Sequence, residues 1–290
     1  MRSTRWRRTA LLTTASALGL GAGMNQSALA GPPPPPSPWE FKVWGSYLTT
    51  TGDHYLTSPS EPDVSGAPAA GQGGGIQAYV SYDFTPHWDA RLTGAGNWLD
   101  DAYYYSYGPG NARSKTSVNY YFADFDAGYS FNPSPRTSLR LAAGVEYANF
   151  ASKWKVGENF AGHYYYDAGL KNNFWGVGPH ASVEGSYALG RSGFSLVGSV
   201  DGSVLFGNLS QSGLQIPDFS SGGGGRTAYS ARAYAGISYA LPIPNVDASI
   251  EGGIQVQQWW NVNNTTLFDS GKTHASETFW GPTFGVELRW

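Results

Sequence analysis

The chain has no cysteine among its 290 residues. Without cysteine neither disulfide bonds nor thiolate metal sites can form, so an exported form of this protein must be stabilised by its fold alone. Charge is also scarce, because only 13% of the residues are Asp, Glu, Lys or Arg. Past residue 30, no apolar run reaches the roughly 18 residues that a membrane-spanning helix requires. The sequence therefore excludes a helical membrane protein and a disulfide-stabilised domain.

Basic residues do not outnumber acidic ones. The 18 Lys and Arg stand against 21 Asp and Glu, which gives a formal charge of −3. A protein that binds nucleic acid needs a clustered basic face, so we expect no nucleic-acid partner. The histidines are scattered without the spacing of a metal site. The glycine runs lack the Lys and Ser/Thr of a phosphate-binding loop, so we expect no cofactor.

The start of the chain has the three parts of a secretory signal. Several arginines come first, the uncharged stretch 9–23 follows, and Ala28-Leu29-Ala30 supplies the small residues that a signal peptidase reads. The sequence PPPPPSP at 32–38 then forms a stiff extended segment. We predict a secretory signal peptide at residues 1–30, a proline-rich periplasmic spacer at 31–38 and one domain at 39–290.

Aromatic residues and glycine are abundant in the domain. Aromatics make up 15% of the chain, with 11 Trp, 19 Tyr and 14 Phe, and there are 39 Gly. A soluble domain with so little charge would have difficulty keeping its surface hydrated. A transmembrane β-barrel resolves this difficulty, because its apolar face points to lipid and its aromatics lie at the two membrane interfaces. We expect Trp259-Trp260, Tyr103-Tyr104-Tyr105 and Tyr164-Tyr165-Tyr166 to belong to such interfaces or to loop bases.

Apolar and polar residues alternate with a period of two in several stretches. The clearest are 76–84, 227–241 and 246–257, each with one apolar and one polar face. A soluble β-sandwich would alternate too, but its strands are usually about 5–6 residues long. The stretches here are longer and match the about 9–11 residues of a membrane-spanning strand. The pattern predicts an all-β, antiparallel, up-and-down transmembrane β-barrel.

The connections allow the strands to be counted. Short turns at 85–87, 132–135, 190–192 and 242–245 alternate with long stretches at 51–72, 100–115, 151–172, 207–225 and 261–274, as periplasmic turns alternate with extracellular loops in outer-membrane barrels. We predict ten strands, at 39–50, 73–84, 88–99, 116–131, 137–150, 173–189, 193–207, 226–241, 246–260 and 275–290. A twelve-stranded barrel is the alternative. Because aromatics fall on both faces of 116–131, a β-bulge is expected there.

The last strand indicates where the protein is located. Phe284, Val286, Leu288 and Trp290 alternate to the end of the sequence, and outer-membrane barrels resemble this pattern, since their assembly machinery reads a final strand that ends in an aromatic residue. We therefore expect the protein in the bacterial outer membrane. Its predicted partners are that assembly machinery, outer-membrane lipids and lipopolysaccharide.

Four segments resemble a known family. They are ADFDAGYSF at 123–131, LRLAAGVEYANF at 139–150, FWGVGPHASVEGSYALGRSGFSLVGSVDGSVLFG at 174–207 and FWGPTFGVELRW at 279–290. These segments look like the pore-forming outer-membrane proteins typified by the Legionella major outer membrane protein. The resemblance implies a β-barrel pore for small solutes, and it has no catalytic residues to transfer.

Charged side chains fall on the strand faces opposite the apolar ones. A basic residue that faced lipid would cost about 2–4 kcal/mol at the membrane midplane, so we predict that these side chains face the lumen. The predicted pore-lining residues are Asp83, Asp89, Arg91, Asp126, Arg140, Glu146, Glu184, Asp201, Arg232, Asp247, Glu251 and Glu287.

Two functions are compatible with a charged lumen. In an open channel the acidic excess would favour cations. In a narrow barrel the same residues could instead fill the lumen with salt bridges, because eight strands are just filled by side chains whereas about 16 or more leave a channel. We predict a narrow passive pore for small hydrophilic solutes or ions. The alternative is a non-conducting structural or surface-interaction barrel that acts through its extracellular loops.

A remote alternative is enzymatic. His274 and Ser276 share one side of the last strand, with Glu277 and Glu287 in the same segment. Outer-membrane lipid A deacylases resemble this arrangement, in which a histidine assists attack by a serine. A His and a Ser two residues apart are common by chance in protein sequences. We therefore predict that the protein is not an enzyme and keep a lipid A-directed esterase as an alternative.

Overall fold

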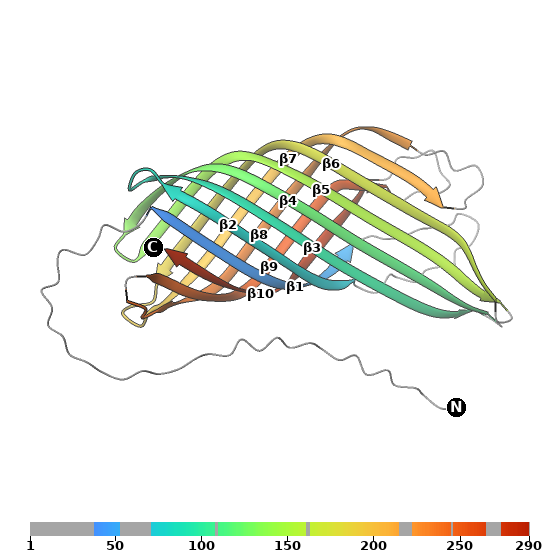
Figure 1. Cartoon of the computed structure of the whole chain (residues 1–290), viewed down its shortest axis with the longest axis horizontal. Coiled ribbons are helices and arrows are strands. Elements are labelled where there is room, and N and C mark those ends of the chain that lie inside the picture. Colours follow the sequence, from blue (N-terminus) through green and yellow to red (C-terminus); the bar gives the residue numbers. More distant parts are fainter. Residues whose placement is uncertain are drawn as a thin grey trace, which may run out of the picture. The chain divides into compact units, whose positions relative to one another are not determined.

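Ten antiparallel strands close into a single β-barrel (Figure 1). The computed structural model describes residues 38–52, 71–107, 110–160, 163–214, 222–244, 246–264 and 274–289. The strands are β1 (Trp39–Gly52), β2 (Gln72–Asp83), β3 (Trp88–Tyr107), β4 (Gly110–Ser134), β5 (Thr137–Phe160), β6 (His163–Ala188), β7 (Phe194–Leu214), β8 (Gly222–Leu241), β9 (Asp247–Asn264) and β10 (His274–Arg289). Each pairs with its neighbours in sequence, and β1 pairs with β10 to close the barrel. The predicted ten-stranded barrel is confirmed and the twelve-stranded alternative is wrong.

The predicted signal peptide lies outside the described residues, as does the predicted spacer apart from its last residue. Among the described residues, no helix is long and apolar enough to cross a membrane.

The connections at the two ends of the barrel differ. At one end, β2 leads to β3 through 84–87, β4 to β5 through 135–136, β6 to β7 through 189–193, and β8 to β9 through 242–246, as the sequence predicted. The chain turns there with the help of Gly190 and Gly193, whose positive φ angles of 72° and 79° suit a residue without a Cβ. The strand end Arg289 pairs with Glu40 at this end as well. Short turns mark the periplasmic side of an outer-membrane barrel.

At the opposite end three of the predicted loops are wrong. Most of 207–225 belongs to β7 and β8, which remain paired as far as Gln211 and Gly222. Residues 100–115 and 151–172 mostly continue the strands, since β3 and β4 remain paired as far as Tyr107 and Gly110, and β5 and β6 as far as Phe160 and His163. Polar residues are frequent in the sequence of these segments, so the alternation that marks a lipid-facing strand is lost although the backbone ladder continues. β4, β5 and β6 reach 25, 24 and 26 residues, against about 9–11 needed to cross a membrane. They project beyond it on the extracellular side, the right-hand end in Figure 1.

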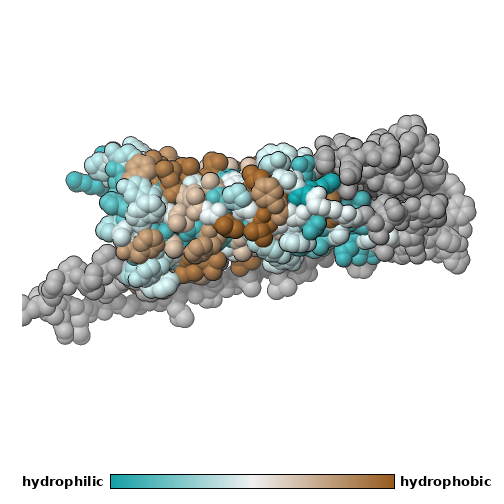
Figure 2. Space-filling view, turned by 90° about the horizontal axis from the view of Figure 1, so that it is seen from above, coloured by the Kyte–Doolittle hydropathy of each residue, from teal (hydrophilic) through white to brown (hydrophobic). Residues whose placement is uncertain are grey.

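An apolar band surrounds the barrel between two rings of aromatic side chains. Outward-facing aliphatic residues such as Leu92, Val145, Val200 and Ile254 are exposed, which is the pattern of a lipid-facing wall. The ring near the turns contains Trp39, Tyr82, Trp88, Tyr129, Tyr187 and Phe194, and the other ring contains Tyr47, Trp98, Tyr121, Tyr147, Trp175, Tyr229, Trp260 and Trp280. On the face shown in Figure 2, this band lies between hydrophilic surfaces.

The β-bulge expected in 116–131 is absent. The register of β4 is unbroken from Thr116 to Tyr129 with β3 and from Thr116 to Phe131 with β5. Aromatics occur on both faces because Tyr120 and Phe122 point into the lumen and are buried, while Tyr121 belongs to the outer ring. The aromatic residues on both faces of 116–131 therefore indicate large side chains in the lumen, and their interpretation as a sign of a β-bulge was wrong.

Candidate functional site

A layer of large apolar side chains crosses the lumen near its extracellular end. We call it the aromatic layer, and its members are Leu48, Leu99, Val118, Tyr120, Phe122, Phe150, Phe174, Leu205, Trp259, Val262 and Phe279, all inward-facing and at most 3% exposed. Its rings lie at the level of the extracellular aromatic ring, because Trp259 is followed by the lipid-facing Trp260, and Phe279 by the lipid-facing Trp280.

The rings of the aromatic layer meet in the middle of the barrel. The centroid of the Tyr120 ring lies 4.8 Å from that of Phe279, 5.6 Å from that of Trp259 and 5.9 Å from that of Phe150. These residues come from β4, β10, β9 and β5, so side chains from distant strands touch across the lumen. The Tyr120 hydroxyl donates a hydrogen bond of 2.9 Å to Oε1 of Gln257, below the layer. Such contacts match the packing of a protein core.

The inward position of Val262 in the aromatic layer depends on a β-bulge in β9. Asn261 has a φ of 63°, a left-handed conformation that asparagine tolerates better than most residues. Two residues of β9, Asn261 and Val262, have no partner in β10 at this point, where the register shifts between Ala275 and Ser276. This bulge turns Val262 and Asn263 into the interior, where both are buried.

Below the aromatic layer lies a cavity of about 620 Å³. It opens at the end with short turns, since Thr85, Pro86 and Asn132 belong to its wall, and Gln257 is among its deepest residues. Nine carboxylates and five Lys or Arg side chains line it. Among the side chains that the structure describes, the interior therefore has a charged cavity on the periplasmic side and the aromatic layer on the extracellular side of that cavity.

The deepest charges are organised around Arg232 of β8. Its Nη2 lies 2.8 Å from Oε2 of Glu146 and 3.1 Å from Oδ2 of Asp124, and its Nε donates to Asp201. The guanidinium also stacks over Phe122, with its central carbon 3.8 Å from the ring centroid. Because Glu146 is fully buried and Arg232 nearly so, this cluster connects the charged cavity with the aromatic layer.

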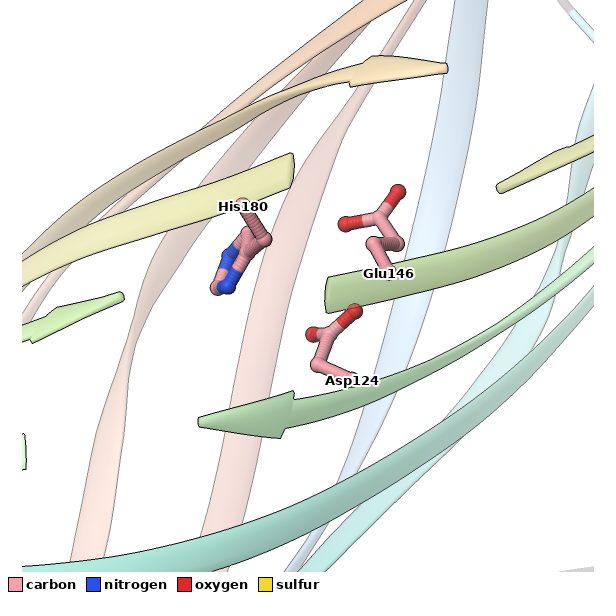
Figure 3. A group of neighbouring side chains, drawn as sticks. All are labelled: Asp124, Glu146 and His180. Atoms are coloured by element: carbon pink, nitrogen blue, oxygen red, sulfur yellow. The ribbon is translucent and has the colours of Figure 1, made fainter. Parts of the chain in front are cut away.

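Asp124, Glu146 and His180 converge from β4, β5 and β6, as Figure 3 shows. Their potential ligand atoms all lie within 4.8 Å of one another, a spacing that could hold a metal ion. However, Nη2 of Arg232 donates to both carboxylates and lies 3.3 Å from Nε2 of His180. Nδ1 of the histidine is bound to Asp126 at 2.8 Å. The guanidinium therefore already supplies the positive charge, and these residues do not fit a metal site.

A second cluster lies closer to the turns. Arg140 contacts Asp89 at 2.6 Å and Glu184 at 2.9 Å, and Arg91 contacts the same Glu184 at 2.5 Å. The two arginines share one carboxylate across β3, β5 and β6, so the charges link strands of one part of the wall, including β3 and β5, which are not paired with each other.

Three further ion pairs involve β1 and β10, the strands that close the barrel. Lys42 of β1 lies 2.8 Å from Glu251 and 3.5 Å from Glu287. At the rim of the cavity, Arg289 donates to Asp83. The cavity wall is thus lined with ion pairs, and the acidic excess remains on its surface.

The predicted lumen residues are distributed over these layers. The cavity wall contains Asp83, Asp89, Arg91, Asp126, Arg140, Glu184, Asp201, Arg232, Glu251 and Glu287. Glu146 lies deeper, in the Arg232 cluster, and Asp247 is exposed at the periplasmic end of β9. That these residues line a conducting pore remains a prediction. The sequence analysis did not predict the aromatic layer. The aromatic residues on the polar face of 116–131 and the Trp259-Trp260 pair could have indicated it, because each places an aromatic side chain on the inward face of its strand.

The two carboxylates proposed for an esterase, Glu277 and Glu287, do not lie beside Ser276. Glu277 points into the lumen, where it is 1% exposed and accepts a hydrogen bond from Asn263, whereas Ser276 is on the opposite face of β10. Glu287 lies near the other end of the strand, beside Lys42. The side chain of His274 lies outside the described ones. Neither carboxylate can therefore orient a histidine beside Ser276.

Comparison with known proteins gives one family and a set of similar folds. The family model described as Legionella pneumophila major outer membrane protein precursor matches residues 34–290. Among curated protein sequences none matches significantly. The outer membrane protease OmpT from Escherichia coli is 14% identical, with 88% of this chain and 98% of OmpT covered and a TM-score of 0.54. OprG from Pseudomonas aeruginosa is 10% identical, with coverages of 88% and 97% and a TM-score of 0.29. At this identity the likeness to OmpT concerns the fold alone.

Proposed function

The chain belongs to the family of the Legionella pneumophila major outer membrane protein and is a β-barrel of the bacterial outer membrane, and from this premise we propose that it is a closed barrel that acts through its extracellular surface rather than as an open pore. The aromatic layer is the observation that carries the proposal. Ions and hydrophilic solutes need a hydrated path, and a packed apolar constriction blocks conduction by excluding water.

The strand lengths support a role at the cell surface. β4, β5 and β6 are more than twice as long as membrane crossing requires, so a large part of the chain stands outside the apolar band. Strands held in a ladder present side chains more rigidly than loops do. The charged cavity then has a structural role, since its ion pairs tie together strands on different sides of the barrel.

A narrow passive pore is the second candidate, favoured by the charged cavity of about 620 Å³. For this function the aromatic layer would have to act as a gate. Because carboxylates exceed basic side chains on the cavity wall, an opened pore would prefer cations.

The two candidates differ in the conductance of the wild-type protein. We expect the refolded protein, added to a planar lipid bilayer, to insert without discrete current steps. A separate measurement, the electrophoretic shift that heating causes in folded barrels, would verify that the protein is folded. Discrete steps with a cation-selective reversal potential would contradict the closed barrel and support the gated pore.

A further inference from the structure

Four lysines form a group on the outside of the extended strands. Lys115 of β4 is directly opposite Lys155 of β5, and Lys153 of β5 is directly opposite Lys171 of β6. We call them the lysine patch. Side chains directly opposite one another across antiparallel strands have Cβ atoms about 4.5–5.5 Å apart, and like charges in such positions are destabilising. The repulsion within two such pairs side by side therefore lowers the stability of this part of the barrel.

The lysine patch faces outward and is exposed. On β5, Lys153 and Lys155 share the face of Val145 and Tyr147, and on β6, Lys171 shares the face of Trp175. All four lysines are exposed, and in the part of the chain that the structure describes none forms an ion pair. The positive charge of Lys155 is the largest of several causes, the charges of Lys171 and Lys115 among them, that lower the pKa of Lys153. The four ammonium groups thus act on one another.

The height of the patch places it among lipid headgroups. Lys171 lies four residues beyond Trp175 of the extracellular aromatic ring, and Lys153 six residues beyond Tyr147 of the same ring. At about 3.3 Å per residue these spacings correspond to about 13–20 Å along the tilted strands. The patch is therefore outside the apolar band and beside the headgroups of the outer leaflet.

Neighbouring side chains add hydrogen-bond donors. Ser117 pairs with Lys153, and Ser212 pairs with Lys171, so an outward row of hydroxyl and ammonium groups crosses β4 to β7. The exposed Asp100, opposite Ser117, is an acidic side chain at the edge of this row. A row of cationic and hydroxyl donors on a lipid-facing wall suits a phosphate-bearing ligand that lies in the membrane surface.

We propose that the lysine patch binds the phosphate groups of an outer-leaflet glycolipid of the lipid A class. The bound phosphates would remove the repulsion between the lysine pairs and anchor the extended part of β4 to β6 at the membrane surface. This site is on the outer wall, so it does not depend on whether the lumen is open or closed.

The test compares charge removal at the patch with equal charge removal elsewhere. The double variant Lys153→Gln/Lys171→Gln is expected to weaken binding of diphosphorylated lipid A to the refolded protein by about tenfold or more, because each lysine near an anionic surface contributes substantially to binding. The matched control is Arg136→Gln/Arg191→Gln, which removes two exposed charges at the periplasmic turns. That control is expected to bind as the wild type does.

Two further arms identify the ligand. Dephosphorylated lipid A should bind wild type and variant equally weakly, and inorganic phosphate should not displace the glycolipid. The charge-conserving variant Lys153→Arg/Lys171→Arg should retain binding, and the heat-induced shift in electrophoretic mobility verifies that each variant is folded. Equal losses in the patch variant and the turn control, or full displacement by inorganic phosphate, would overturn the proposal.

Discussion

Replacement of both Trp259 and Phe279 by alanine is expected to turn a non-conducting barrel into one with discrete current steps. Both rings are fully buried in the aromatic layer and pack against Tyr120, so their removal takes out much of the central seal. The cavity below would then connect with the extracellular side. Since replacement of a buried Phe or Trp by alanine costs about 3–5 kcal/mol, the variant should also be less stable, and its folding must be verified before the current is recorded.

The neighbouring residues provide a matched control for this variant. Trp260 and Trp280 follow the two layer residues in sequence but face lipid, at 40% and 46% exposure. Their joint replacement by alanine removes a comparable amount of aromatic surface from the same strands without changing the lumen. It should leave the bilayer current at baseline. If the inward variant also stays at baseline while folded, the seal does not depend on these rings.

Replacement of Arg232 by methionine is expected to lower the free energy of unfolding by about 3–5 kcal/mol, the range found when one partner of a buried ion pair is removed. Three carboxylates, those of Asp124, Glu146 and Asp201, share this guanidinium. Without it, negative charges would remain close together in a poorly hydrated part of the lumen. Urea titration of the protein folded in lipid vesicles measures the change.

Two controls separate the role of Arg232 from a general effect of charge. Arg136→Met removes an exposed guanidinium at the turn between β4 and β5 and should change stability little. Adding Asp124→Asn and Glu146→Gln to the Arg232→Met variant should restore part of the lost stability, because fewer negative charges then lack a partner. A loss of under about 1 kcal/mol in Arg232→Met would show that the cluster is better hydrated than its burial indicates.

The fold could be predicted largely because a lipid-facing wall imposes strict alternation. In β2, β8 and β9 the apolar face of the sequence is the outer face of the barrel, and the short turns follow from proline, glycine and asparagine. The extensions of β3 to β6 could not be recognised in the same way. Outside the membrane no lipid requires an apolar strand face, so polarity no longer distinguishes a strand from a loop.

The candidate site was only partly predictable for a different reason. That Arg232 and Glu146 face inward follows from the period of two within each strand. That they touch does not, because β8 and β5 are separated by two strands and come together only through the curvature and register of the closed barrel. Phe150 and Trp259 likewise belong to one layer only in the closed structure. The alternation in the sequence determines which face of its strand a residue occupies, whereas closure of the barrel determines which residues it contacts across the lumen.

Sided labelling tests the closed lumen most directly, and the absence of cysteine makes it possible with single substitutions. Ser199→Cys places a thiol on the cavity wall, and Ser212→Cys places one on the exposed outer face of the same strand, beyond the membrane. In vesicles whose outer side corresponds to the cell exterior, a membrane-impermeant thiol reagent added outside should label the Ser212→Cys variant and leave Ser199→Cys unlabelled, whereas enclosed reagent should label Ser199→Cys. Labelling of Ser199→Cys from outside, as fast as that of Ser212→Cys, would contradict a sealed lumen.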